Sequence, residues 1–298
     1  MMVTCIIVPE AAFAAEGQNA LTSSVVKETH KGAEYYPDEE YAEYDIIKIS
    51  NQRCYDKAYA VLTRVNNQRV NMGLPKVKMD KSLLETAMKR AAETALCFEH
   101  VRPNGQMCFT ANNKMNAENI ALGQTTAAQV MTGWMNSPGH RANILSRDAR
   151  SIGIGCVYHN GIYYWVQCFS SSQAVTLNIP SNKTVTTAVE LNPELGVYDP
   201  YLSVTTNKIK AGNTVKATFI MPNATVQGIE AIAVPGCVKW TSGSNKCSVG
   251  TGGVIKGHAY GKSTIKGSLG TLSATKVINV TGSITAVINN CKYRVFTN

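Results

Sequence analysis

Apolar residues recur at helical spacing over residues 50–71, which predicts an amphipathic helix. Five positions fall on its apolar face: Cys54, Ala58, Val61, Leu62 and Val65. Gly73 and Pro75 follow directly and predict its end, because glycine tolerates the C-terminal cap conformation and proline cannot continue a helix. The same spacing predicts a second helix over residues 81–96, which Asp80 can cap.

A third helix is predicted to begin near Thr126. Thr126 and Gln129 have the spacing of a capping box, in which each side chain bonds the free backbone N–H of the other residue. The apolar face of this helix includes Trp134, which we expect in the core. A short helix is then predicted at "SPGHRANIL", where Ser137 suits the N-cap and Pro138 the first helical position.

The period of the apolar pattern changes from helix to strand after Arg150. The sequence "SIGIGCVYHNGIYYWVQCF" predicts a β-hairpin, because Asn160-Gly161 is a strong two-residue turn signal between runs of Ile, Val, Tyr and Trp. Helices followed by strands in one unit predict an α+β fold or a three-layer sandwich. Residues 201–298 show short alternating strands with Gly, Asn and Ser turns, which predict a small all-β sandwich.

These patterns divide the chain of 298 residues into five segments. Residues 1–17 are apolar and rich in small residues, which is typical of a secretion signal, although they contain no basic residue; an ordinary disordered terminus is the alternative. Residues 18–45 are polar and acidic and predict a linker. Residues 46–172 and 201–298 are the two predicted domains, and residues 173–200, rich in Ser, Thr, Asn and Pro, predict a second linker.

Both predicted domains are basic. Residues 48–169 hold fifteen Lys and Arg against seven Asp and Glu, and residues 173–298 hold twelve against four. This charge favours anionic surface polymers, acidic lipids or host and cell-surface proteins as partners; a positive charge without a specific partner is the alternative. No Arg-rich helix or aromatic–basic platform occurs, which argues against nucleic acid. Beyond the N-terminus, no apolar run reaches the ~20 residues of a transmembrane helix.

Nine cysteines favour an oxidising compartment, and a cytosolic protein with buried thiols is the alternative. Cys5 belongs to the predicted signal, and an even number remains without it. Three neighbouring pairs are candidate disulfides: Cys97 with Cys108, Cys156 with Cys168, and Cys237 with Cys247. The sequence does not decide whether Cys156 and Cys168 form a bond, because a tight turn does not place them directly opposite each other. Cys54 is expected to be a buried thiol, and a bridge to Cys291 is the alternative.

Several motifs follow the order found in the CAP superfamily of cysteine-rich secretory proteins, antigen 5 and pathogenesis-related 1 proteins. "AENIA", a helix and then "GWMNSPGHRANIL" resemble the signature of its bacterial, SCP-like members. "VNNQRVNMGLP" resembles the end of their first helix, and "FEHVRPNG" resembles their first-histidine loop. The resemblance covers residues 45–170 and implies a three-layer α-β-α sandwich.

The second predicted domain resembles bacterial Ig-like group 2 domains. Three stretches carry the likeness over residues 201–282: "IKAGNTVKATF", "VKWTS" and "GGVIKGHAYGKSTIKGSLG". The resemblance implies an Ig-like β-sandwich, a module that usually serves as a surface spacer or an adhesive domain.

The CAP resemblance implies a cleft with two histidines and two acidic residues. His100 matches the first histidine, Glu118 the first acid and His140 the second histidine. The second acid of many eukaryotic members corresponds to Ser137, so this set of four is incomplete. Imidazole and carboxylate groups are good zinc ligands. The candidate site for a divalent metal therefore consists of His100, Glu118 and His140, with zinc as the leading candidate. Ser137 and Asn119 are further candidate binding residues.

A structural role for the same residues is the main alternative. Glu118 and His140 can each bond backbone groups and brace a loop, and a histidine beside a glutamate can also serve as a general base. No GxSxG nucleophile elbow occurs, however. We therefore expect an exported, non-enzymatic binding protein. The alternatives are a metal-dependent hydrolase of peptides or cell-wall material and a lipid or sterol carrier. His159 and His258 are expected to face solvent.

Overall fold

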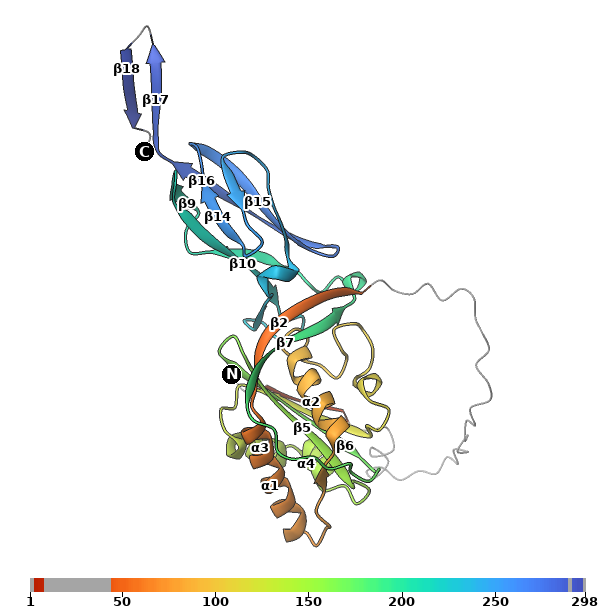
Figure 1. Ribbon diagram of the computed structural model, residues 1–298. Coiled ribbons are helices and arrows are strands. Elements are labelled where there is room, and N and C mark those ends of the chain that lie inside the picture. Colours follow the sequence, from red (N-terminus) through yellow and green to blue (C-terminus); the bar gives the residue numbers. More distant parts are fainter. Residues whose placement is uncertain (1–2, 8–43, 289–290, 297–298) are drawn as a thin grey trace, which may run out of the picture.

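The computed structural model describes residues 3–7, 44–288 and 291–296. The predicted acidic linker, residues 18–45, lies outside this part of the chain except for its last two residues, and so does most of the predicted signal segment. Two units follow one another along the described chain (Figure 1). The first combines helices with a sheet, and the second consists of sheets.

A seven-stranded sheet forms the centre of the first unit. Its strands run in the order β1 (Val3–Ile7), β4 (Ala117–Leu122), β6 (Ile162–Ser170), β5 (Ser151–His159), β2 (Asp45–Arg53) and β7 (Lys183–Leu191), and β3 (Lys78–Met79) pairs with β5. Neighbours in this order are antiparallel, and the short β3 is parallel to β5. The sheet therefore places β4 and β6, from distant parts of the sequence, side by side.

Helices cover both faces of this sheet. They are α1 (Tyr55–Asn71), α2 (Lys81–Glu93), α3 (Ala127–Met135) and α4 (Pro138–Ile144), with 3-10 turns at η2 (Cys108–Ala111) and η3 (Pro193–Leu195). α2 lies directly on β5, where a Cβ added to Gly153 would come within 2.0 Å of the Leu83 carbonyl oxygen. Side chains alternate between the faces of a strand, so Cys156 points to the other face, where its thiol meets Cys54 at the start of α1.

Several local predictions are confirmed. Thr126 and Gln129 form the capping box of α3, and the Asp80 side chain accepts hydrogen bonds from two backbone N–H groups of α2. Asn160 and Gly161 turn the β5–β6 hairpin with φ angles of 45° and 84°. Each of these predictions depends on contacts within a few residues, which a sequence shows directly.

Two predicted boundaries are wrong. The first helix begins at Tyr55 instead of residue 50, because residues 45–53 form β2 with alternating buried and exposed positions. Residues 173–200, expected to be a linker, contain β7, which pairs with β2 along its whole length. Alternate residues of β7 point into the core, but the surrounding Ser- and Thr-rich sequence hides this short pattern.

The second unit consists of two facing sheets and a hairpin. One sheet has the order β11 (Glu230–Ile232), β10 (Thr214–Pro222), β14 (Val254–Gly257) and β13 (Cys247–Val249), with β8 (Tyr201–Val204) on β10. The other has the order β12 (Lys239–Ser242), β15 (Gly261–Leu269), β16 (Leu272–Thr281) and β9 (Lys208–Lys210); η4 (Pro235–Cys237) precedes it. β17 (Ser283–Ile288) and β18 (Cys291–Phe296) form the separate hairpin. Gly267 of β15 faces Phe219 of β10 and Leu202 of β8 in the opposite sheet, so apolar side chains fill the space between the two sheets of this unit.

Hydrogen bonds join the two units. The Asn223 side chain donates to the Thr94 carbonyl oxygen at 2.9 Å, and the Thr271 N–H donates to the Asp45 carboxylate at 3.0 Å. These bonds connect the end of α2 and the start of β2 with loops of the second unit, so the contacts of the interface are spread over separate places.

His159 lies in this interface and is only 5% exposed. Its Nδ1 lies 2.8 Å from the Ser50 carbonyl oxygen, and its Nε2 accepts the Ile232 N–H at 3.0 Å. The expectation that His159 faces solvent is therefore wrong, because the second unit covers the hairpin tip. His258 is exposed, as expected.

Candidate functional site

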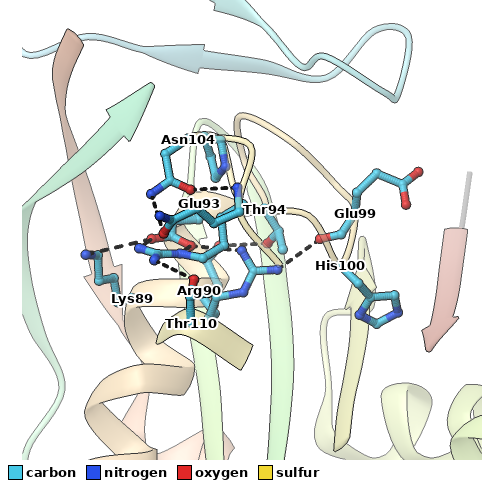
Figure 2. Close-up of polar contacts among 12 residues, drawn as sticks. Lys89, Arg90, Glu93, Thr94, Glu99, His100, Asn104 and Thr110 are labelled. Atoms are coloured by element: carbon cyan, nitrogen blue, oxygen red, sulfur yellow. Dashed lines mark hydrogen bonds and ion pairs between the residues drawn. The ribbon is translucent and has the colours of Figure 1, made fainter. Parts of the chain in front are cut away.

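Arg90 lies at the centre of a buried group of charged side chains. Its guanidinium donates to Glu118 Oε1 at 2.9 Å and to Glu93 Oε2 at 2.8 Å. Glu93 also accepts two hydrogen bonds from Arg102, at 2.9 and 3.1 Å. These four residues form the charged cluster, and Figure 2 shows its Arg90–Glu93 part between α2 and the loop that follows. Arg90, Glu93 and Glu118 are each at most 1% exposed.

The charged cluster is balanced, since two guanidinium groups face two carboxylates. Burial alone would raise the pKa of Glu118, but the Arg90 guanidinium and the His100 imidazole outweigh it and lower this pKa. Burial would also raise the pKa of Glu93, and Arg102 and Arg90 lower it in the same way. Both carboxylates are therefore ionised in the folded protein at neutral pH.

His100 lies beside the charged cluster, in the loop after α2. Its side chain is 1% exposed, and Nδ1 lies 2.8 Å from Glu118 Oε2. Because the Glu118 carboxylate is an acceptor, Nδ1 carries a proton, and in the neutral imidazole Nε2 then presents its lone pair. Nε2 is buried and has no hydrogen-bond partner among the described residues. A carboxylate behind an imidazole, with the far nitrogen open, is the arrangement that orients histidine ligands in metal sites.

Cys108, at the start of η2, is the third potential ligand close to this histidine. One ligand atom from each of His100, Cys108 and Glu118 lies within 4.8 Å of the others. Burial, together with the Glu118 charge, raises the pKa of Cys108 to about 12. Cys108 is therefore a neutral thiol that bonds to Glu118, and it is a weaker candidate ligand than the His100 imidazole.

His140 lies on the first turn of α4, is fully buried and does not belong to the group formed by His100, Cys108 and Glu118. Asn119 of β4 donates to the His140 carbonyl oxygen at 3.1 Å and to the Gln167 side chain at 2.9 Å. The Asn143 side chain donates to Asn119 at 2.8 Å. Asn119, which the sequence offers as a binding residue, thus anchors α4 to β4.

The side chains of Ser137 and Glu99 do not make the contacts that their positions in the sequence suggest. Ser137 occupies the N-cap position of α4, but its side chain makes no capping hydrogen bond. Glu99 supplies its backbone carbonyl oxygen to Arg90 at 2.9 Å, while its carboxylate points away from Arg90 (Figure 2). Neither side chain adds a charge to the buried site.

Sequence reasoning missed Arg90, Glu93 and Arg102. Arg90 and Glu93 are one helical turn apart on the apolar stripe of α2, next to Ala87 and Ala91. Charged residues on a buried stripe are almost always paired, so their position was a usable signal. The partner in the distant β4 could not be identified in this way.

The three candidate disulfides do not form in the structure, where all six cysteines are free thiols. In the β5–β6 ladder Cys156 pairs with Trp165, while Cys168 pairs with Gly153. Positions 165 and 168 are an odd number of residues apart, so Cys156 and Cys168 point to opposite faces of the sheet.

The other two pairs are separated by their surroundings. The Cys108 thiol bonds to Glu118. Cys237 contacts the Lys48 carbonyl oxygen at 4.0 Å, whereas Cys247 lies buried on β13. The alternative of a bridge from Cys54 to Cys291 involves a cysteine of which the structure describes the backbone alone.

Residues 62–169 match the CAP family model, described as the cysteine-rich secretory protein family. The uncharacterised protein YkwD of Bacillus subtilis is 34% identical over 128 residues, which are 40% of this chain and 48% of that protein. The chain therefore spans about half the length of this relative. Together these matches show that the chain contains a CAP domain of the bacterial type, and His100, Glu118 and His140 all lie within the matched residues.

Solved structures with partial likeness include two bacterial proteins. An extracellular protein with an SCP domain from Bacillus anthracis has 21% identity and a TM-score of 0.35, with 39% of this chain and 40% of that chain covered. An outer surface protein from Borrelia burgdorferi has 16% identity and a TM-score of 0.34, with 40% of this chain and 93% of that chain covered. In the described part of the chain, no helix has the length and apolarity needed to cross a membrane.

Proposed function

We propose that this is an exported, non-enzymatic binding protein whose CAP domain binds a divalent metal ion at His100. Zinc is the leading candidate for this ion. The observation that carries the proposal is the His100 Nε2 atom, which is buried and lacks a hydrogen-bond partner in the described chain. An unpaired buried polar atom costs free energy, and a bound metal ion would remove that cost.

The residues around His100 fit such a site. Nδ1 donates to Glu118, which fixes the ring and leaves Nε2 toward the metal. Both Glu118 oxygens already accept hydrogen bonds from Arg90, so Glu118 orients His100 instead of binding the metal itself. His140 is the proposed second ligand. A bound zinc ion would supply a positive anchor for an anionic group of a partner.

The same contacts support binding over hydrolysis. A general base works best with a pKa near the working pH, whereas the pKa of Glu118 is lowered and its oxygens are engaged. The lining of the surface hollow beside α2 and β7 includes three charged residues, Arg53, Glu85 and Lys89, which does not favour the carrier alternative.

We further propose that the second unit is an Ig-like spacer that holds the CAP domain near an anionic surface polymer. Two facing sheets and the pattern "GGVIKGHAYGKSTIKGSLG" support this identity. The basic charge of both units supports the partner. The apolar residues 1–17 support export, and removal of this segment as a signal would take β1 from the edge of the sheet.

Calorimetric titration of the metal-free full-length protein with zinc tests the site. One binding event is expected; it should disappear in His100→Ala and weaken roughly 10–100-fold in Glu118→Gln, since outer carboxylates tune affinity by that factor. His258→Ala is the matched control, because this histidine is exposed in the second unit. Circular dichroism checks that each variant folds. Equal zinc binding by the parent and by a folded His100→Ala protein would contradict the site.

A further inference from the structure

Cys54 and Cys156 occupy opposite positions across two paired strands. The β2–β5 ladder pairs Gln52 with Tyr158 and Arg53 with Val157, and the next step places Cys54 opposite Cys156. The Cys54 N–H donates to the Cys156 carbonyl oxygen at 2.8 Å, which confirms this register. Hydrogen-bonded residues opposite each other have Cα atoms about 5.5 Å apart, within the range that a disulfide spans.

The thiols of these two residues also meet. Cys54 is 3% exposed and Cys156 is fully buried, and their side chains interact directly with each other. Cys168, the partner that the sequence suggested for Cys156, points to the other face of the sheet. The pair therefore follows from the register of β2 and β5, which are about a hundred residues apart in sequence.

We propose that Cys54 and Cys156 are a redox pair that closes into a disulfide between the start of α1 and β5. The proposal rests on the strand register and the thiol contact alone, so it holds or fails independently of the metal site at His100.

Cys54 is the nucleophile of the pair. It is the N-cap residue of α1, where the helix dipole favours a thiolate. The hydrogen bond from the Cys156 thiol lowers the pKa of Cys54 against the opposing effect of burial, while burial holds the pKa of Cys156 well above its usual range.

The oxidant is a small-molecule disulfide, and the exchange proceeds in two steps. The Cys54 thiolate attacks one sulfur of the oxidant, forms a mixed disulfide and releases the other half as a thiolate. The Cys156 sulfur, once it has lost its proton, then attacks the Cys54 sulfur and releases the second half. One S–S bond forms, one breaks, and the oxidant leaves as two thiols with two electrons and two protons.

The closed loop would contain all four helices, His100 and Glu118. A cross-link around a loop of this size restricts the unfolded chain strongly, so oxidation is expected to raise the Tm of the first unit by roughly 10 °C.

Peptide mapping of the full-length protein tests the pair. The protein is refolded with oxidised and reduced glutathione, alkylated and digested with trypsin and then chymotrypsin, because Cys156 and Cys168 share the tryptic peptide 151–183. Mass spectrometry is expected to find a peptide containing Cys54 bonded to one containing Cys156, and a reductant should abolish both the link and the Tm increase.

Two variants sharpen the result. Cys156→Ala should leave Cys54 open to alkylation, whereas Cys168→Ala, the matched buried control from the same hairpin, should keep the link. The proposal is overturned if oxidised, folded protein carries alkyl groups on both Cys54 and Cys156, or if either is bonded to another cysteine. The map of the parent protein decides this even where a variant fails to fold.

Discussion

The interiors of the two units differ in kind. The first unit buries Arg90, Glu93 and Glu118, whereas the buried polar residues described in the second unit, Asn223 and Ser263, carry no charge. Buried charges require partners at fixed places, while an apolar core requires only shape and volume. The two cores therefore depend on different interactions, paired charges in the first unit and apolar packing in the second.

Removal of Arg90 should give the largest effect. Arg90→Ala leaves two buried carboxylates without their shared partner and is expected to cost about 3–5 kcal/mol of unfolding free energy. Lys89→Ala is the neighbouring control; Lys89 is partly exposed and its amino group lies 3.9 Å from Glu93, so its loss should cost less than about 1 kcal/mol. Urea unfolding in a Trp240→Phe background measures both, because Trp134 and Trp165 then report on the first unit alone. Equal losses in the two variants would show that the charged cluster is not essential to stability.

A mild change in the second core should have a smaller effect. Ile265→Val removes one methylene from a fully buried position of β15 and is expected to cost about 1 kcal/mol. The Trp240 signal, taken as the difference between the parent protein and Trp240→Phe, follows this unit in urea. A loss as large as that of Arg90→Ala would remove the contrast between the two interiors.

The junction between the units should respond to pH through His159. Burial lowers its pKa below the ordinary 6.5, and its ring is held neutral between the Ser50 carbonyl and the Ile232 N–H. The unfolded chain therefore binds a proton first as the pH falls, so stability is full above pH 6.5 and declines below it until the folded pKa is reached. Urea unfolding at pH 7 and pH 5 should show a smaller decline for His159→Gln than for the parent protein. An identical decline would assign the pH effect to other groups.

The smallest effect is expected at Ser137. Its side chain makes no capping hydrogen bond, so Ser137→Ala should change the unfolding free energy by less than about 0.5 kcal/mol. Thr126→Ala is the comparison, since Thr126 does cap α3 and its loss should cost about 1 kcal/mol. Thermal unfolding of both variants measures the difference.

The sequence predicts those features of the structure that depend on residues close together in the chain. The capping box at Thr126, the turn at Asn160-Gly161 and the positions of His100 and Glu118 in their motifs all come from short stretches. The strand β7 and the cover over His159 depend on segments far away in sequence, and so do the thiol contact of Cys54 and the partner of Arg90. The candidate disulfide between Cys156 and Cys168 failed for the same reason, since the direction of a cysteine on a strand depends on strand register.

Two glycines of β5, Gly153 and Gly155, determine where α2 places Arg90 of the charged cluster. An added Cβ would lie 2.0 Å from the Leu83 oxygen at Gly153 and 2.1 Å from the Ala87 oxygen at Gly155, so α2 rests on bare backbone. Arg90 follows on the same helix, and its reach to β4 depends on that close seating. A single extra carbon on β5 would lift the helix and misalign a guanidinium several residues away. Loss of the site can therefore arise from a mutation to alanine that touches no charged group.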